Sequence, residues 1–229
     1  MRALTLTDPA LLAGVRASYK ATALAMSPLR LWMFDETSGT TAADSSGNGV
    51  NLTLTNGPAL NAGGPIGRFC EFDGTDDYAT GAATSLTGEW SAVALVRIDT
   101  QADRQIVGNW MAGTATQRWV LGMTATGIEV FSYNSGYSGF GAAVTLTGGA
   151  WKLVGVSRRA GTNASNLYVN GVSIGVGTVA APLGSSTTEV YRKSGGISYT
   201  DGGVAGVGVW SSALTTAQHL ALASAAGLA

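Results

Sequence analysis

Acidic side chains gather in the segment RFCEFDGTDDYATG, residues 68–81, where Glu71, Asp73, Asp76 and Asp77 lie among aromatic residues. Such a group has three chemical uses. Two carboxyl groups about 5 to 5.5 Å apart on a rigid frame can hydrolyse a glycosidic bond. Clustered carboxylates can bind calcium, which takes about six to eight oxygen ligands. An Asp followed by Gly can simply close a turn.

The order of residues in this segment favours the turn. Asp73-Gly74 is a turn signal, because the Asp side chain can accept hydrogen bonds from its own turn and Gly adopts the positive φ. The strand then ends before Asp76 can line up beside Glu71, and Tyr78 begins the next strand. We therefore assign neither a catalytic residue nor a metal ligand, and keep calcium binding by Asp73, Asp76 and Asp77 as the alternative.

The other reactive residue types are sparse. His219 is the only histidine and Cys70 the only cysteine, so no zinc cluster or Ser-His-Asp triad has local support and no intrachain disulfide can form. We expect Cys70 to be an inert thiol in the core. No phosphate-binding glycine loop stands between a strand and a helix, and we expect neither a cofactor nor enzymatic activity.

Aromatic residues are the candidate ligand contacts. FSYNSGYSGFG, residues 131–141, spaces Tyr133, Tyr137 and Phe140 with Ser, Asn and Gly. Such amphipathic rings offer flat stacking faces beside polar groups, a combination used to bind sugars and proteins. Trp110 in the preceding glycine- and threonine-rich stretch joins them as a candidate. Packing in the core is the alternative for each ring.

Composition excludes several classes of function. The chain of 229 residues is 45% hydrophobic and only 12% charged, with 33 glycines and a net charge of −1. A nucleic-acid-binding protein would carry a basic patch, so nucleic acid is excluded as a partner. Asp8, Arg16 and Lys20 interrupt any apolar run at the N-terminus. We expect no signal peptide, no membrane span and synthesis in the cytoplasm.

Short strands separated by turns dominate the chain after Pro28. Asn170-Gly171 is the strongest hairpin signal, because a type I′ turn needs positive φ at both central positions. WSAVALVRI is apolar at both alternating sets of positions, which is typical of a strand buried on both faces. The expected strands lie in residues 29–35, 68–74, 90–99, 104–110, 118–123, 127–133, 150–159, 166–175 and 202–210.

Helices are expected only near the two ends of the chain. Asp8 and Pro9 can begin a helix with one apolar stripe, and a T-x-x-Q capping box at Thr215 and Gln218 can begin the other. We divide the chain into an N-terminal helical arm, residues 1–28, and a single β-domain, residues 29–229. We expect the arm to dock on a neighbouring subunit, and docking on its own β-domain is the alternative.

Several motifs in this order resemble one family. D-E-T-S-G-T-x-x-x-D-S-S-G-N-G at residues 35–49, F-D-G-T-D-D-Y at 72–78 and L-Y-V-N-G at 167–171 are similar to the laminin-G-like, concanavalin-A-like jelly-roll domains, over about Leu29 to Ala223. The resemblance implies an all-β sandwich of two curved antiparallel sheets, whose concave face and rim loops often hold the ligand. Members are usually non-catalytic modules that bind carbohydrate or protein, sometimes with calcium, and some occur in bacteriophage tail, fibre and capsid-associated proteins.

Two departures bear on the resemblance. Family members often end the last core strand with an acidic pair, in a pattern like G-x-I-D-E-V, whereas this chain has Ala205 and Gly206, so calcium is not expected there. Laminarinase-type glycosidases share the sandwich and carry E-x-D-x-x-E. The segment beginning at Glu71 is a near miss, since its third acid is Asp76.

These observations together predict a non-enzymatic structural and adhesion module of a phage virion. The arm would attach it to assembly proteins, and the sandwich would present rim loops to cell-surface glycans or to proteins. We also expect a homo-oligomer or a larger assembly. A free carbohydrate-binding lectin domain is the alternative function, and a divergent glycoside hydrolase is the less favoured one.

Overall fold

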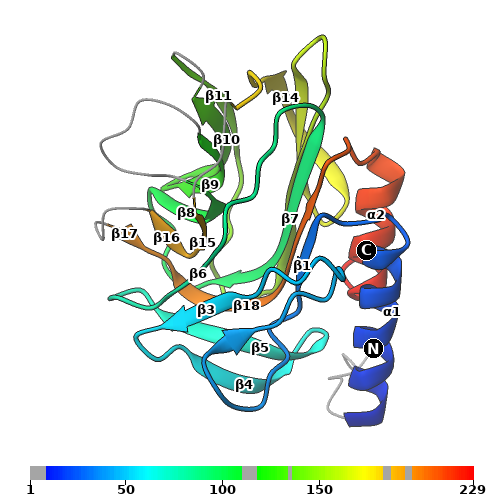
Figure 1. Cartoon of the computed structure of the whole chain (residues 1–229), viewed down its shortest axis with the longest axis vertical. Helices are drawn as coiled ribbons and strands as arrows, with labels where there is room; N and C mark the ends of the chain where they lie inside the picture. The colour runs from blue at the N-terminus through cyan, green and yellow to red at the C-terminus, as the bar shows by residue number, and fades with distance from the viewer. Residues whose placement is uncertain (1–8, 110–117, 134–135, 183–186, 194–197) are drawn as a thin grey trace.

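The computed structural model describes residues 9–109, 118–133, 136–182, 187–193 and 198–229. The described strands form two large antiparallel sheets that face each other (Figure 1). The first sheet has the order β14 (Val172–Thr178), β13 (Ala164–Val169), β12 (Lys152–Arg158), β7 (Trp90–Ile98), β18 (Asp201–Trp210), β5 (Gly67–Asp73) and β4 (Ala59–Gly64), with β1 (Arg30–Trp32) paired to β18.

The second sheet lies on the other side of the core. Its order is β11 (Tyr137–Ala143), β10 (Gly127–Tyr133), β9 (Arg118–Thr124), β8 (Arg104–Gly108), β15 (Thr188–Val190), β6 (Tyr78–Gly81), β3 (Leu52–Thr55) and β2 (Thr41–Ala42). A small hairpin of β16 (Arg192–Lys193) and β17 (Ser198–Tyr199) lies beside it. The predicted all-β sandwich is confirmed, and each segment predicted to be a strand overlaps at least one observed strand.

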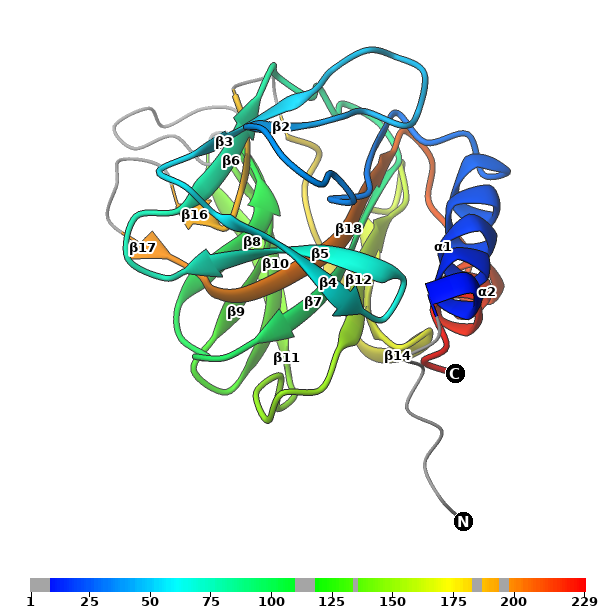
Figure 2. The ribbon, with the colours of Figure 1, turned by 90° about the horizontal axis from the view of Figure 1, so that it is seen from below.

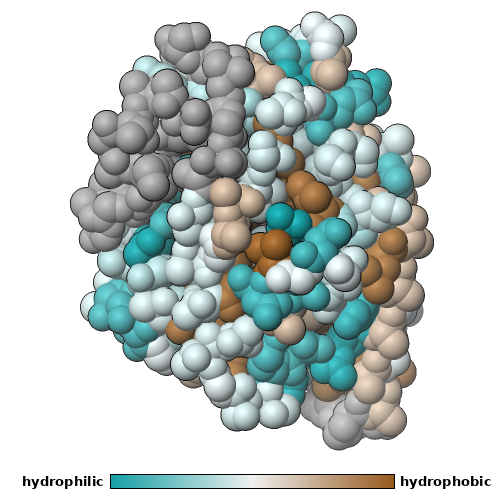
Figure 3. All heavy atoms as spheres, in the orientation of Figure 1, coloured by the Kyte–Doolittle hydropathy of each residue, from teal (hydrophilic) through white to brown (hydrophobic). Residues whose placement is uncertain are grey.

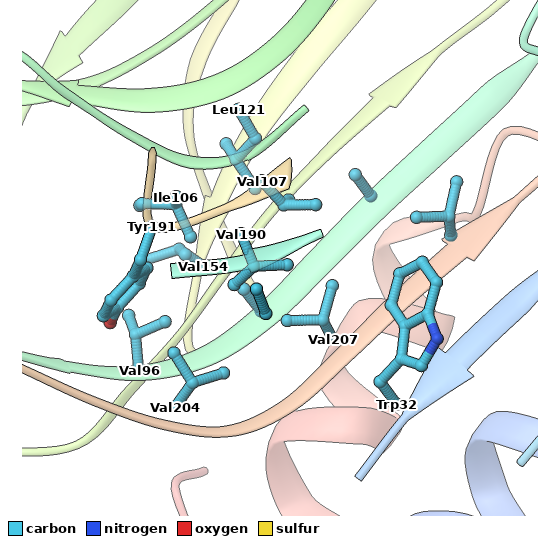
Figure 4. Packing of buried hydrophobic residues seen from close by; sticks show 14 of the residues in the cluster. Trp32, Val96, Ile106, Val107, Leu121, Val154, Val190, Tyr191, Val204 and Val207 are labelled. Atoms are coloured by element: carbon cyan, nitrogen blue, oxygen red, sulfur yellow. The ribbon is translucent and has the colours of Figure 1, made fainter. Parts of the chain in front are cut away.

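The main core fills the space between the sheets. Figure 4 shows Val96, Val154 and Val207 of the first sheet pointing toward Val107 and Leu121 of the second. Apart from the grey atoms, most of the surface in Figure 3 is pale or teal, which means intermediate or hydrophilic hydropathy.

Strand β7 is buried on both faces, as its sequence predicts. Ala92, Ala94 and Val96 face the main core, whereas Val93 and Leu95 belong to a second hydrophobic cluster on the outer side of the sheet. The second cluster exists because two helices cover that side.

Helices α1 (Pro9–Leu24) and α2 (Thr216–Ala225) lie side by side over the outer side of the first sheet (Figures 1 and 2). Tyr19 and Ala23 of α1 are fully buried in the second cluster with Leu31 and Met33. The expectation that this helix docks on a neighbouring subunit is therefore wrong for its apolar face, which the chain's own sandwich occupies. The predicted boundary at residue 28 falls between α1 and β1.

The local signals at the start of α2 and between β13 and β14 are also confirmed. The Thr215 side chain accepts a hydrogen bond from the Gln218 N–H, and the Gln218 side chain accepts one from the Thr215 N–H. Asn170 and Gly171 have φ of 49° and 80°, as a type I′ turn requires. Among the described residues, no helix is long and apolar enough to cross a bilayer.

Candidate functional site

Side chains of β10 alternate between the main core and the outer face of the second sheet. Ile128 and Val130 point into the main core, so Glu129, Phe131 and Tyr133 point to the outside, because successive side chains of a strand alternate between faces. Strand β11 pairs with β10 so that Tyr137 lies opposite Tyr133 and Gly139 lies opposite Phe131.

Two aromatic rings form a platform there. The Phe131 and Tyr137 ring centroids are 5.3 Å apart with an interplanar angle of 31°. Phe131 is only 4% exposed, whereas Tyr137 is 63% exposed. Phe131 thus supports the Tyr137 ring, which presents itself to solvent. We call Glu129, Phe131, Tyr133 and Tyr137 the aromatic face.

Polar side chains border the aromatic face. Asp103, Arg104 and Gln105 line a hollow too small to hold a water molecule, together with Val120, Glu129 and Phe131. Gln105 is 1% exposed, so Asp103 and Arg104 are the members of this group nearer the surface. Partial burial, together with the negative charges of Glu129 and Asp103, raises the pKa of the Tyr137 hydroxyl. The ring therefore stays neutral at physiological pH and can both donate and accept a hydrogen bond.

Arg104 connects this border to the small hairpin. Its Nε donates to the Tyr199 carbonyl at 2.9 Å, and its Nη1 donates to the Ser198 hydroxyl at 2.8 Å. These hydrogen bonds to β17, a strand distant in sequence, hold the Arg104 guanidinium in place beside the hollow.

Buried polar side chains of β8 and β15 lie next to the hollow. Gln105 donates through Nε2 to the Glu189 carbonyl at 3.0 Å, and Arg192 forms an ion pair with Glu189. The Arg192 guanidinium lies 3.6 Å from the centroid of the Tyr78 ring. Burial raises the pKa of Glu189 although Arg192 opposes the shift. Gln105 Oε1 and Glu189 Oε2 are buried and make no hydrogen bond in the described structure.

The predicted ligand contacts are only partly brought together. Tyr133 and Tyr137 lie opposite each other on the aromatic face. Strand β11 is not among the strands expected from the sequence. Phe140 lies on the inner side of β11, against the main core, and a side chain at Gly177 would meet its ring. Trp110 lies outside the described residues.

Sequence reasoning missed the polar members Gln105, Glu189 and Arg192. Their strands are separated in the chain, and no local motif connects them. The sequence does contain a signal for the position of Phe140. Residues three apart on one strand face opposite sides, so Tyr137 and Phe140 cannot share a face.

The acidic segment forms the predicted turn. Asp73 Oδ1 accepts hydrogen bonds from the backbone N–H of Thr75 at 2.8 Å and of Asp76 at 3.3 Å, and Gly74 has φ of 71°. Asp77 Oδ2 accepts from the Asp73 N–H at 3.2 Å. The backbone hydrogen bonds lower the pKa of Asp73, while partial burial raises that of Asp77. One oxygen from each of the three Asp carboxylates lies within 4.8 Å of the others.

Glu71 is not part of that turn. Its Oε1 accepts from Arg97 Nη2 at 2.5 Å, and Arg97 also pairs with Asp99 at 2.9 Å. The Arg97 guanidinium lies near the rings of Phe69 and Trp151, on the outer side of the first sheet. Glu71 is thus engaged in an ion pair on the face opposite to the aromatic face.

His219 has partners that are distant in sequence. Its Nε2 lies 2.8 Å from the Ser157 hydroxyl of β12, and its ring stacks on Tyr168 of β13 at 3.8 Å between centroids. Ser157 is in turn 2.8 Å from the Ser91 hydroxyl. Burial lowers the pKa of His219 to about 3, so this group of side chains holds α2 on the sheet with a neutral imidazole.

Two antiparallel sheets packed face to face define a β-sandwich of the jelly-roll class. Residues 73–218, more than half of the chain, match the model of the laminin-G type within the concanavalin A-like lectin/glucanases superfamily. The chain therefore belongs to this superfamily. A search of curated proteins found no match.

Solved structures with the same fold include receptor-binding domains of clostridial toxins. The binding domain of Paraclostridial Mosquitocidal Protein 1 matches with a TM-score of 0.69 and 11% identity over 87% of this chain and 52% of that one. A structure of botulinum neurotoxin type C matches with a TM-score of 0.69 and 12% identity, over 90% of this chain and 52% of that one. Its description states that cell entry of this toxin depends on interaction with two ganglioside molecules.

The botulinum neurotoxin serotype D ligand-binding domain in complex with N-acetylneuraminic acid matches with a TM-score of 0.66 and 13% identity, over 90% of this chain and 52% of that one. The chain thus spans about half the length of these structures. At such low identity the similarity is one of fold.

Proposed function

We propose that this chain is a glycan-binding module and that the aromatic face is its binding surface. The observation that carries the proposal is the exposed Tyr137 ring, supported from behind by Phe131 and bordered by polar side chains. A sugar ring offers an apolar face of C–H groups and a rim of hydroxyls. It can stack on Tyr137 while its hydroxyls exchange hydrogen bonds with the border.

The chemistry of the border suits hydroxyl groups. Tyr137 can both donate and accept, and the carboxylates of Asp103 and Glu129 accept only. Arg104 adds donors whose direction is fixed by its bonds to β17. Donors and acceptors are thus mixed around one apolar platform, as recognition of a polyhydroxylated ring requires.

The similar toxin domains support this class of ligand. Their descriptions name gangliosides and N-acetylneuraminic acid, which are glycan ligands. Their low identity means that ligand residues cannot be transferred one by one, so the proposal rests on the aromatic face of this chain. The same proteins lend no support to the virion role and location expected from the family resemblance and the composition, which stay predictions.

A glycan array with the whole chain tests the proposal, with Tyr137→Ala as the variant and Leu11→Ala as the control. Leu11 is also an exposed apolar side chain, 50% exposed, but lies on α1. Loss of one stacking ring costs about 1.4 kcal/mol or more, so we expect at least about a tenfold loss of affinity in Tyr137→Ala alone. Unchanged binding in Tyr137→Ala would refute the aromatic face as the site.

We also propose that the module is non-enzymatic. The acids that resemble a glycosidase motif are otherwise engaged, since Glu71 pairs with Arg97 and Asp73 closes its own turn. An assay of β-glucan hydrolysis, with Glu71→Gln as the comparison, should detect no activity in either protein. Hydrolysis that is lost in Glu71→Gln would overturn this part of the proposal.

A further inference from the structure

A pocket lies on the outer side of the first sheet, on the opposite side of the sandwich from the aromatic face. Its volume is about 290 Å³, and its lining comes from the end of β12, from β13 and from the segment before α2. Pockets for small molecules begin at about 300 Å³, so this one suits a molecule of the size of one sugar. We call it the β12–β13 pocket, and its lining residues are Ser157, Arg159, Ala164, Asn166, Tyr168 and Leu214.

The charged member of the lining is Arg159. Its side chain is exposed and forms no ion pair within the described residues. Glu89 follows the last pair of the β7–β12 ladder, Trp90 with Arg158, and is not in ion-pair contact with Arg159. A guanidinium presents N–H donors in a planar fork that matches a carboxylate. The pocket therefore offers a carboxylate-binding group that no described acidic side chain occupies.

The hydroxyl of Ser157 has a defined hydrogen-bonding role. Ser91 Oγ donates to the Ser212 carbonyl at 2.9 Å and accepts from the Leu214 N–H at 2.8 Å. The single proton of Ser91 is thus used, so Ser157 must donate in the 2.8 Å contact between the two hydroxyls. His219 Nε2 then carries a proton and donates to Ser157 Oγ. Ser157 is left as an acceptor toward the pocket, and the protonated ring nitrogen cannot activate it as a nucleophile.

The other polar groups of the lining make only long hydrogen bonds. Asn166 Nδ2 donates to the Tyr168 hydroxyl at 3.3 Å, and that hydroxyl lies 3.3 Å from the Thr216 hydroxyl. Usual distances are about 2.7–3.2 Å for N–H···O and about 2.5–3.0 Å for O–H···O. Ligand hydroxyls can replace such weak contacts at little cost. Asn166 and Tyr168 can each donate and accept, so they suit a hydroxylated ligand better than an apolar one.

We propose that the β12–β13 pocket binds a small polyhydroxylated carboxylate of about the size of one sugar. The Arg159 guanidinium binds the carboxylate, while Asn166 and Tyr168 exchange hydrogen bonds with the hydroxyls. Ser157 accepts one further hydrogen bond at the base of the pocket. The pocket lies on the other sheet from Tyr137, so the proposal does not depend on glycan binding by the aromatic face.

Titration of the isotope-labelled full chain with D-gluconate, followed by NMR, tests the proposal. D-sorbitol is the matched control ligand, because it has the same hydroxylated carbon chain without the carboxylate. We expect gluconate to shift the backbone amide signals of residues 157–168. It should bind at least about tenfold more tightly than sorbitol, because only gluconate can form the charge-assisted hydrogen bonds with Arg159.

Two substitutions separate the carboxylate contact from the hydroxyl contacts. Arg159→Gln should weaken gluconate binding at least about tenfold and leave sorbitol binding unchanged. Arg68→Gln removes the same charge from β5, outside the pocket, and should bind gluconate as the wild type does. Tyr168→Phe keeps the ring that stacks on His219 and should weaken both ligands by about two- to tenfold, because one neutral hydrogen bond is lost.

Three results would each overturn the proposal: equal affinity for gluconate and sorbitol, gluconate binding that survives Arg159→Gln, or no binding of gluconate at all. Arg159 is exposed, so Arg159→Gln should keep the circular dichroism spectrum of the wild type. Tyr137→Ala should bind gluconate as the wild type does. Loss of glycan binding at the aromatic face and loss of gluconate binding at the β12–β13 pocket are therefore scored separately.

Discussion

The imidazole of His219 is buried between α2 and β12, in hydrogen-bond contact with Ser157. In an unfolded chain a histidine binds a proton near pH 6.5, whereas here burial keeps the ring neutral down to about pH 3. Between those values the unfolded state binds more protons than the folded state. The free energy of unfolding must therefore fall as the pH falls through this window.

We expect His219→Gln to remove this pH dependence. Between pH 7 and pH 3.5 the free energy of unfolding should fall on the order of 4 kcal/mol more in the wild type than in the variant. The reason is that only the wild type must keep an imidazole uncharged. Urea denaturation at several pH values measures both proteins. The carboxylates titrate in both and cancel in the comparison. Equal pH dependence in the two proteins would show that His219 is not buried in neutral form.

At the scale of elements, the β13–β14 hairpin depends on Asn170 in two ways. Its backbone has φ of 49°, and its Oδ1 accepts a hydrogen bond from the Leu153 N–H of β12 at 2.9 Å. One residue thus shapes the turn and ties it to the neighbouring strand. The hairpin also positions Gly171 against Leu220 of α2.

Two substitutions separate these roles. Asn170→Gly keeps the positive φ and loses the side-chain acceptor, which should cost about 1 kcal/mol. Asn170→Ala loses both, and the left-handed backbone adds about 1–2 kcal/mol. Chemical denaturation should therefore rank the wild type above Asn170→Gly and that above Asn170→Ala. Asn170→Ala as stable as Asn170→Gly would mean that the turn relaxes to another conformation.

At the scale of the whole molecule, the helices form a third layer over the sandwich. Tyr19 joins that layer to the sheet: its ring is fully buried and lies close to Gly206 of β18. Its hydroxyl is buried as well and has no hydrogen-bond partner in the described structure. Burial raises the pKa of that hydroxyl, which stays neutral. The ring therefore stabilises the layer while the hydroxyl opposes it.

We expect Tyr19→Phe to be more stable than the wild type by about 1 kcal/mol, because it removes a buried polar group without a partner. Tyr19→Ala should lower the free energy of unfolding by about 3–5 kcal/mol, because it leaves a cavity. Denaturation curves measure both, and hydrogen exchange in α1 shows whether the helix detaches in Tyr19→Ala. A destabilised Tyr19→Phe would indicate a hydrogen bond at the Tyr19 hydroxyl.

The sequence by itself determined the features that depend on neighbours within a few residues. The turns at Asp73-Gly74 and Asn170-Gly171, the capping box at Thr215 and the doubly buried β7 follow from local hydrogen bonds, allowed φ values and periodicity. Together with the ordered motifs they were enough to predict the sandwich and its superfamily.

Only the tertiary structure decided which side chains meet. Strand register brought Tyr137 against Phe131 and turned Phe140 inward, and sheet pairing placed Gln105 beside Glu189, residues 84 positions apart. Packing of α1 on its own sheet replaced the expected contact with a neighbour. Such contacts depend on how distant strands align and on which faces are covered, and the chemistry of a single segment contains neither piece of information.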